Sequence, residues 1–138
     1  EADAGRSIGI TTEDKVFADR GNVIVKTDDD SQPHITDTIK ANIFWLDKEP
    51  MEKGERLLFK CATQEMMCEV EKFEKIIDSS TLEVLSEDGD TIQNREVGSV
   101  IIKTEKPVVT ELFNDIPELG RLVLERKDTV AGGIIIHE

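Results

Sequence analysis

The sequence predicts an all-β protein whose larger part is a closed antiparallel barrel of six strands. Short apolar segments recur from Thr38 onward, and turn-forming sequences such as Lys48-Glu49-Pro50 and Lys53-Gly54 separate them. Short strands at this spacing are typical of small barrels and sandwiches. The sequence contains no apolar run of the roughly 18 residues that a membrane-spanning helix needs. Its 138 residues leave room for one domain and part of a second.

Each of the six predicted strands has a short apolar core bounded by polar residues. They are Ile39 to Leu46, Arg56 to Ala62, Met66 to Phe73, Val97 to Thr104, Gly120 to Glu125 and Val130 to Ile136. The last two flank a charged turn at Lys127-Asp128, which indicates a hairpin. Paired glycines at Gly132 and Gly133 would let the final strand pass close to another backbone.

The stretch from residue 64 to 77 supports two interpretations. Its apolar residues recur at helical spacing among good helix formers, and they are Met66, Met67, Val70, Phe73, Ile76 and Ile77. Period alone therefore favours a helix. A strand, whose side chains alternate between its two faces, can also accommodate the stretch if Cys68 and Val70 face inward. Phe73 does not fit this alternation. We predict a strand here because of a family resemblance described below.

Residues 1–27 are predicted to form a separate unit with two short strands, centred on Ser7-Ile8-Gly9-Ile10 and Asn22-Val23-Ile24-Val25. Two strands alone are marginal in water, so this unit should pack on the barrel or on a second copy of the chain. Residues 28–37 are predicted to be a linker, because three aspartates and then a proline break the pattern. Asp28 and Asp30 have the spacing of calcium ligands, but the glycine and flanking helices of an EF-hand are missing.

The charge balance argues against nucleic acid as a partner. Acidic residues outnumber basic ones 30 to 17, which gives a net charge of −13. A surface this acidic repels phosphates over most of its area. The first residues, with Glu1 and Asp3, do not resemble a signal peptide, so we expect a cytoplasmic protein with no membrane contact.

The cysteines are predicted to be buried free thiols. Cys61 and Cys68 have no nearby histidine, since His34 and His137 lie far away in sequence, and no zinc site is expected. If Gln64-Glu65 forms a two-residue turn, the two cysteines face each other across a hairpin. Small buried hydrophobes are favoured, and a disulfide or redox pair is the alternative.

No catalytic, cofactor-binding or metal-ligating residue is predicted. Trp45 is expected in the core rather than at an interface. Arg121 is expected in an ion pair at a strand edge, the alternative being a carboxylate of another domain. Carboxylates that could suggest acid–base chemistry sit in polar, turn-like contexts and should be solvated; they are Glu13, Asp14, Glu87, Asp88 and Glu118. Asp88-Gly89-Asp90 is predicted to be a turn.

Several segments resemble the last two barrel domains of translation-factor-type GTPases. They are Ala4-Gly5-Arg6-Ser7-Ile8-Gly9-Ile10, Arg20-Gly21-Asn22-Val23-Ile24, Leu119 to Arg126 and Thr129 to Ile136. The resemblance implies that residues 38–138 form a barrel like domain III of elongation factor Tu. It also implies that residues 1–27 are the last strands of the preceding, domain II-like barrel.

Within that superfamily, four segments are similar to the GTPase (large) subunits of sulfate adenylyltransferase: Ile43 to Pro50, Cys61 to Glu65, Ile77 to Glu83 and Asn94 to Gly98. The resemblance implies a parent protein that helps convert ATP and sulfate to adenylyl sulfate. Its partners would be the small subunit, which transfers the adenylyl group, and its own GTPase domain. Arg95, between Asn94 and Glu96, departs from the family pattern, so the loop before that strand is expected to differ.

The chain itself is expected to bind neither GTP nor magnesium, because it lacks the GxxxxGK[ST] loop and the Asn-Lys-x-Asp string. We therefore expect a non-catalytic scaffold and partner-interaction module, with a homodimer as an open possibility. The alternative is the tRNA- or factor-binding barrel of a translation elongation or release factor, which Glu111 to Arg121 also resembles. A barrel that binds a small molecule in its mouth is a third interpretation.

Overall fold

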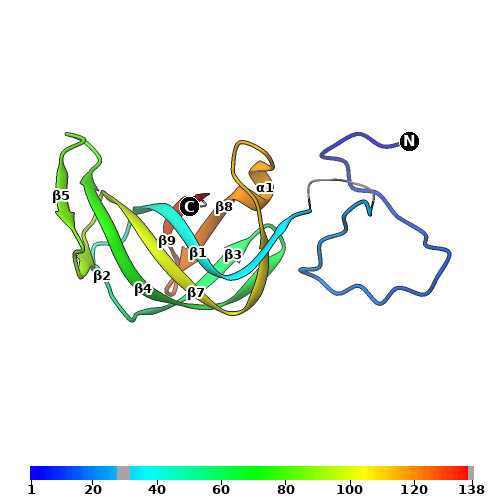
Figure 1. Ribbon diagram of the computed structural model, residues 1–138, viewed down its shortest axis with the longest axis horizontal. Helices are drawn as coiled ribbons and strands as arrows, with labels where there is room; N and C mark the ends of the chain where they lie inside the picture. The colour runs from blue at the N-terminus through cyan, green and yellow to red at the C-terminus, as the bar shows by residue number, and fades with distance from the viewer. Residues whose placement is uncertain (28–31, 137–138) are drawn as a thin grey trace.

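Long, strongly paired strands dominate the computed structural model, which describes residues 1–27 and 32–136 (Figure 1). In chain order the elements are β1 (His34–Trp45), β2 (Met51–Glu52), β3 (Arg56–Cys61), β4 (Gln64–Asp78), β5 (Val84–Glu87), β6 (Thr91–Ile92), β7 (Glu96–Thr110), α1 (Pro117–Gly120), β8 (Arg121–Glu125) and β9 (Thr129–Ile136). The predicted all-β class is confirmed, and the single turn of α1 is the one helix in the described part of the chain.

Six of the strands close into an antiparallel barrel. Hydrogen-bonded neighbours follow the order β3-β8-β9-β1-β7-β4, and β3 also pairs with β4, which completes the ring. The predicted six-stranded barrel is therefore confirmed. β5 extends the sheet beyond β4, while β2 and β6 form a small separate sheet. Because closure removes both edges of a sheet, the barrel proper presents no free strand edge.

The stretch from 64 to 77 is a strand, and its helix-like spacing has a structural cause. β4 pairs with β7 through two irregularities, one between Val70 and Lys72 and one between Phe73 and Lys75. Each bulge adds one residue to β4 and so shifts the side-chain alternation by one. Val70, Phe73 and Ile76 are consequently all buried although they are three residues apart. The strand prediction is confirmed, and the bulges explain why Phe73 breaks parity.

The barrel interior is filled by alternate residues of every strand. The largest fully buried side chains are Trp45, Phe59, Phe73, Ile39, Ile43, Met51, Leu57, Ile92, Ile102, Leu124, Ile135 and Val70. The core position predicted for Trp45 is confirmed, since its exposed fraction is 0%. Burial of this many large apolar groups is the main source of stability in a domain of this size.

Both cysteines are buried and free, as predicted, but they do not face each other. The hairpin turn lies at Ala62 and Thr63, two residues before the predicted Gln64-Glu65 turn, and Ala62 has a φ of 52°. Cys61 is therefore opposite Gln64, and Cys68 is opposite Leu57. Burial raises the pKa of Cys61 to about 11 and that of Cys68 to about 12, which keeps both thiols protonated near neutral pH.

The prediction of two strands within residues 1–27 is wrong. No strand forms in this described segment, and Ile8, Ile10 and Phe17 are exposed, Phe17 by 93%. Isolated strand pairs are marginal in water, and no barrel strand is available to pair with them because the barrel is closed. Residues 16–24 lie against Gln64, Pro107 and Val109, so part of the segment does reach the barrel.

β1 begins at His34, within the stretch predicted as a linker. His34, Ile35 and Thr36 pair with the end of β7, and the register shifts before Thr38. The four residues before Thr38 therefore extend the barrel wall. Asp28 and Asp30, considered above as calcium ligands, lie outside the described residues.

The two glycines of β9 provide a matched test of backbone packing. A Cβ atom on Gly133 would lie 2.6 Å from the carbonyl oxygen of Asn42 and 2.7 Å from Cγ2 of Ile43, whereas a Cβ atom on Gly132 would meet nothing within 4 Å. The predicted close approach is thus a property of Gly133 alone.

We expect Gly133→Ala to lower the free energy of unfolding by about 1–3 kcal/mol. Gly132→Ala should be neutral or slightly stabilising. Urea denaturation of both variants measures this, and equal effects would contradict the close approach.

The buried thiols predict a specific labelling pattern. In the native chain at pH 8, a thiol reagent should react slowly with Cys61 and Cys68, because both are buried and protonated. After denaturation without a reductant, both should be labelled. Mass measurement counts the labels. Rapid labelling of the folded chain, or no labelling after denaturation, would contradict this assignment.

Candidate functional site

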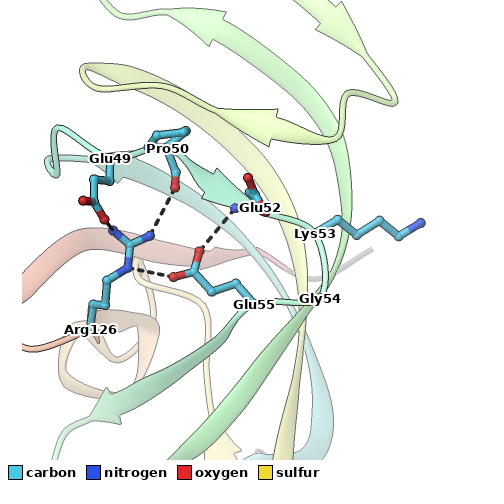
Figure 2. A pocket seen from close by; sticks show the side chains of 7 residues that line it. All are labelled: Glu49, Pro50, Glu52, Lys53, Gly54, Glu55 and Arg126. Atoms are coloured by element: carbon cyan, nitrogen blue, oxygen red, sulfur yellow. Dashed lines mark hydrogen bonds and ion pairs between the residues drawn. The ribbon is translucent and has the colours of Figure 1, made fainter.

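The most developed polar cluster in the described residues surrounds Arg126, in the turn between β8 and β9 (Figure 2). Its Nε donates to Oε1 of Glu55 at 2.7 Å, and one terminal nitrogen donates to Oδ2 of Asp47 at 2.8 Å. The other terminal nitrogen donates to the carbonyl oxygen of Pro50 at 3.1 Å. Glu49 adds an ion pair at 3.7 Å. The guanidinium thereby joins the β8–β9 turn to the segment between β1 and β3.

Trp45 forms the floor of this cluster. The guanidinium carbon of Arg126 lies 5.2 Å from the centre of the Trp45 ring, which is within the range of a cation–π interaction. The indole Nε1 donates to the carbonyl oxygen of Glu49 at 2.8 Å. A buried tryptophan needs a partner for its N–H group, and the chain turn after β1 supplies it.

The loop beneath Arg126 is held in shape by its own carboxylates. Asp47 accepts from the amide of Glu49 at 3.3 Å, and Glu55 accepts from the amide of Glu52 at 3.2 Å. The amide of Glu49 and then the nearby Arg126 charge lower the pKa of the Asp47 carboxyl. Glu55 is the main group that raises the pKa of Arg126. Asp47 and Arg126 are therefore both ionised throughout the neutral range.

The chemistry of this cluster is structural. The hollow beside it is about 510 Å³ and is lined by Glu49, Pro50, Glu52, Lys53, Gly54, Glu55 and Arg126. Each of the three guanidinium nitrogens already donates to an oxygen of the protein, and Lys53 points away from the group (Figure 2). The remaining charged groups of the lining are carboxylates, which repel anions. An anionic substrate would have to displace the contacts that hold the loop.

Arg126 was not singled out by the sequence because its partners are distant along the chain. They lie 71, 79 and 76 residues away, at Glu55, Asp47 and Pro50. An arginine in a charged hairpin turn has no local pattern that distinguishes it from a solvated one. The one usable signal is the lone tryptophan, because indole is the aromatic ring that binds a cation best.

The other residues considered in the sequence are exposed. Arg121 projects into solvent and forms no ion pair in the described part of the chain, so the predicted ion pair at the strand edge is wrong. Its β-strand partner, Ile134, offers no charge. The carboxylates at Glu13, Asp14, Glu87, Asp88 and Glu118 are exposed, as predicted. Asp88 lies in the predicted turn and pairs with Lys72 at 3.2 Å.

A second hollow, of about 680 Å³, separates the N-terminal segment from the loop before α1. It is lined by Val23, Ile24, Val25, Lys26, Pro33, Glu111, Asn114, Asp115, Ile116 and Leu119. Its lining is largely apolar and contains no nucleophile with a base. Among the described residues, no group of three or more metal-ligating side chains comes together, and no helix has the length and apolar character to cross a membrane.

Residues 38–136, the closed barrel, match the family described as GTP-eEF1A C-terminal domain-like. The chain is 29% identical over 134 residues to sulfate adenylyltransferase subunit 1 of Francisella tularensis, covering 96% of this chain and 28% of that protein. It is 30% identical over 138 residues to elongation factor 1-alpha of Stylonychia lemnae, covering 98% of this chain and 31% of that protein. The chain thus spans less than a third of the length of these relatives.

The fold is shared with a solved structure of Sup35 complexed with GDP. The two superimpose with a TM-score of 0.70 and 21% identity, over 78% of this chain and 27% of that one. At this identity the likeness concerns the fold. The resemblance stated from the sequence is confirmed, because both branches of the superfamily are among the relatives. Since the matched residues make up most of the chain, the protein belongs to the GTP-eEF1A C-terminal domain-like family.

Proposed function

We propose that this chain is the C-terminal barrel portion of the large subunit of a GTP-dependent sulfate adenylyltransferase. In this role it presents a rigid surface to the small subunit and to its own GTPase domain, in the cytoplasm, without performing chemistry. GTP and magnesium are bound by the GTPase domain of the parent protein. The observation that carries the proposal is the similarity to sulfate adenylyltransferase subunit 1 over 96% of the chain, in a molecule of net charge −13.

The charge distribution favours this branch over the tRNA-binding branch. Proteins that bind tRNA neutralise phosphates with accessible lysines and arginines. Here many of the basic side chains are already paired with carboxylates: Arg6, Lys40, Arg56, Lys60, Lys72, Lys103 and Arg126. The acidic residues outnumber all the basic ones, 30 to 17, and this excess repels a phosphate backbone.

The Arg126 cluster supports a scaffold role, because it fixes one end of the barrel. It joins two loops that are far apart in sequence, through hydrogen bonds to Glu55, Asp47 and Pro50. A module that transmits the state of one domain to another must keep its surface shape as it moves. Partly buried, charge-assisted hydrogen bonds provide that shape better than solvated loops.

The structural role of Arg126 predicts a stability change. Lysine retains the charge, but its three donors share one nitrogen and cannot reach the three separate acceptors that the planar guanidinium spans, so Arg126→Lys should lower the free energy of unfolding by about 1–3 kcal/mol. Arg121→Lys is the matched control, since Arg121 is exposed, and it should change stability by less than about 0.5 kcal/mol. Chemical denaturation monitored by the fluorescence of Trp45 follows both. Equal free energies of unfolding for the two variants would show that the hydrogen bonds of Arg126 do not stabilise the fold.

The proposed partner predicts a binding preference. The chain should bind a sulfate adenylyltransferase small subunit at moderate salt, and it should bind neither aminoacyl-tRNA nor GTP with magnesium. The affinity is expected to be weak, because contacts between domains of this kind are modest and polar. Titration calorimetry with the three ligands measures this. Binding to tRNA without binding to the small subunit would move the protein to the translation branch, and binding of GTP would refute the non-catalytic role.

A further inference from the structure

The last three residues of β4, the turn after them and the whole of β5 form an arm that projects from the barrel. The arm comprises residues 76–90 and lies at the end opposite the N-terminal segment (Figure 1). β5 pairs with β4 through Glu87, Ser86 and Val84, and it pairs with no other strand in the described residues. The amide of Asp88 donates to the carbonyl oxygen of Glu74 at 3.3 Å. In an antiparallel pair, residues that bond to the partner strand alternate with residues whose N–H and C=O groups point away from it. Since Asp88 bonds to β4, the backbone N–H and C=O groups of Glu87 point away from β4. The arm thus has an open strand edge, unlike the closed barrel.

The arm also carries exposed apolar side chains. Leu82 is 77% exposed, and Val84 and Leu85 are about half exposed, at 49% and 50%. Its opposite face is packed, since Ile76 is 3% exposed and lies against Gly89. The arm therefore has a buried face that fixes it to the molecule and an apolar outer face in solvent.

Leu82 is held in an unfavourable backbone conformation. Its φ of 61° lies in the left-handed region, where glycine or asparagine is less strained than leucine. The turn is firmly built: the carboxylate of Asp78 accepts from Ser80 N at 2.8 Å and from Thr81 N at 3.0 Å. Leu82 N donates to the Asp78 carbonyl oxygen at 2.9 Å. An apolar side chain kept in solvent at a strained position has a cost that folding alone does not explain.

The charge around these apolar residues has a single sign. The arm contains five acidic residues, Asp78, Glu83, Glu87, Asp88 and Asp90, and no lysine or arginine. Lys72 pairs with Asp88, and Lys75 stands opposite Glu87 on β4, so the nearest cations offset part of this charge. Glu83 and Glu87 form no ion pair within the described residues. A second copy of the chain would bring the same charge and be repelled.

We propose that the arm is a docking surface for an extended, lysine- or arginine-bearing apolar segment of another protein. The segment adds as a strand to the outer edge of β5, its apolar side chains cover Leu82 and Leu85, and its cations meet Glu83 and Glu87. Strand addition supplies affinity through the main chain, and the alternating side chains supply specificity. The four-residue length of β5 and its bulge at Leu85 limit non-specific pairing, so the affinity is modest. This role does not depend on which branch of the GTPases the parent protein belongs to.

The test uses the full chain and a fluorescent heptapeptide that alternates lysine and valine. A peptide of the same charge that alternates lysine and glycine controls for simple attraction to an acidic protein. The lysine–valine peptide should bind more tightly, and the same peptide with N-methyl groups on alternate residues should lose binding because it cannot pair. In the ¹⁵N-labelled chain, the largest amide shifts should fall on Val84 to Glu87.

Leu82→Gly gives the sharpest variant, because it removes the side chain and relieves the backbone strain. Its melting temperature should be equal to or above that of the parent chain, while affinity for the lysine–valine peptide falls about tenfold. Ile35→Ser removes a side chain of similar exposure, 66%, at the opposite end of the barrel and should leave binding unchanged. Equal binding of the lysine–valine and lysine–glycine peptides, or unchanged binding by Leu82→Gly, overturns the proposal. Concentration-dependent self-association abolished by Leu82→Gly also overturns it, since the occupant would then be a second copy.

Discussion

The pairing of β3 with β4 is the constraint on which the rest of the structure depends. It closes six strands into a ring and removes both free edges from the barrel. Closure also fixes the interior volume, which Trp45, Phe59 and Phe73 fill. The N-terminal residues then have no barrel edge to join, which accounts for their lack of strands. The open edge of β5 lies outside the ring, on the arm.

The barrel could be predicted from the sequence because the pattern of short apolar segments separated by turn residues is repeated over many strands. Pattern alone would have placed a helix at 64–77, where the bulges after Val70 and Phe73 produce a spacing of three residues between buried side chains. A bulge depends on the partner strand, so no local rule reveals it, and the family resemblance was needed. The hairpin turn was misplaced for a related reason. Ala62 adopts a positive φ without the glycine or asparagine that would mark such a turn in the sequence.

The polar cluster around Arg126 could not be predicted, because it joins groups more than 70 residues apart in the chain. Composition did give the excess of acidic charge, but it could not say which cations remain accessible. The structure supplies that information, since it pairs lysines and arginines with neighbouring carboxylates across the outer surface of the barrel. Each exposed pair contributes little to stability. Their combined effect is to neutralise part of the positive charge locally, while the net charge of the chain stays at −13.

The Arg126 cluster and the arm are connected through a short chain of backbone contacts. Arg126 holds Pro50, and the next residues form β2, which pairs with β6 between Met51 and Ile92. The amide of Lys53 then donates to the carbonyl oxygen of Asp90, the last residue of the arm, at 3.1 Å. Because these contacts are continuous, a loosened Arg126 loop would leave the base of the arm less well fixed. The base of the arm is thus anchored, through β2 and β6, to the polar cluster around Arg126, which is the arrangement that the proposed scaffold role requires.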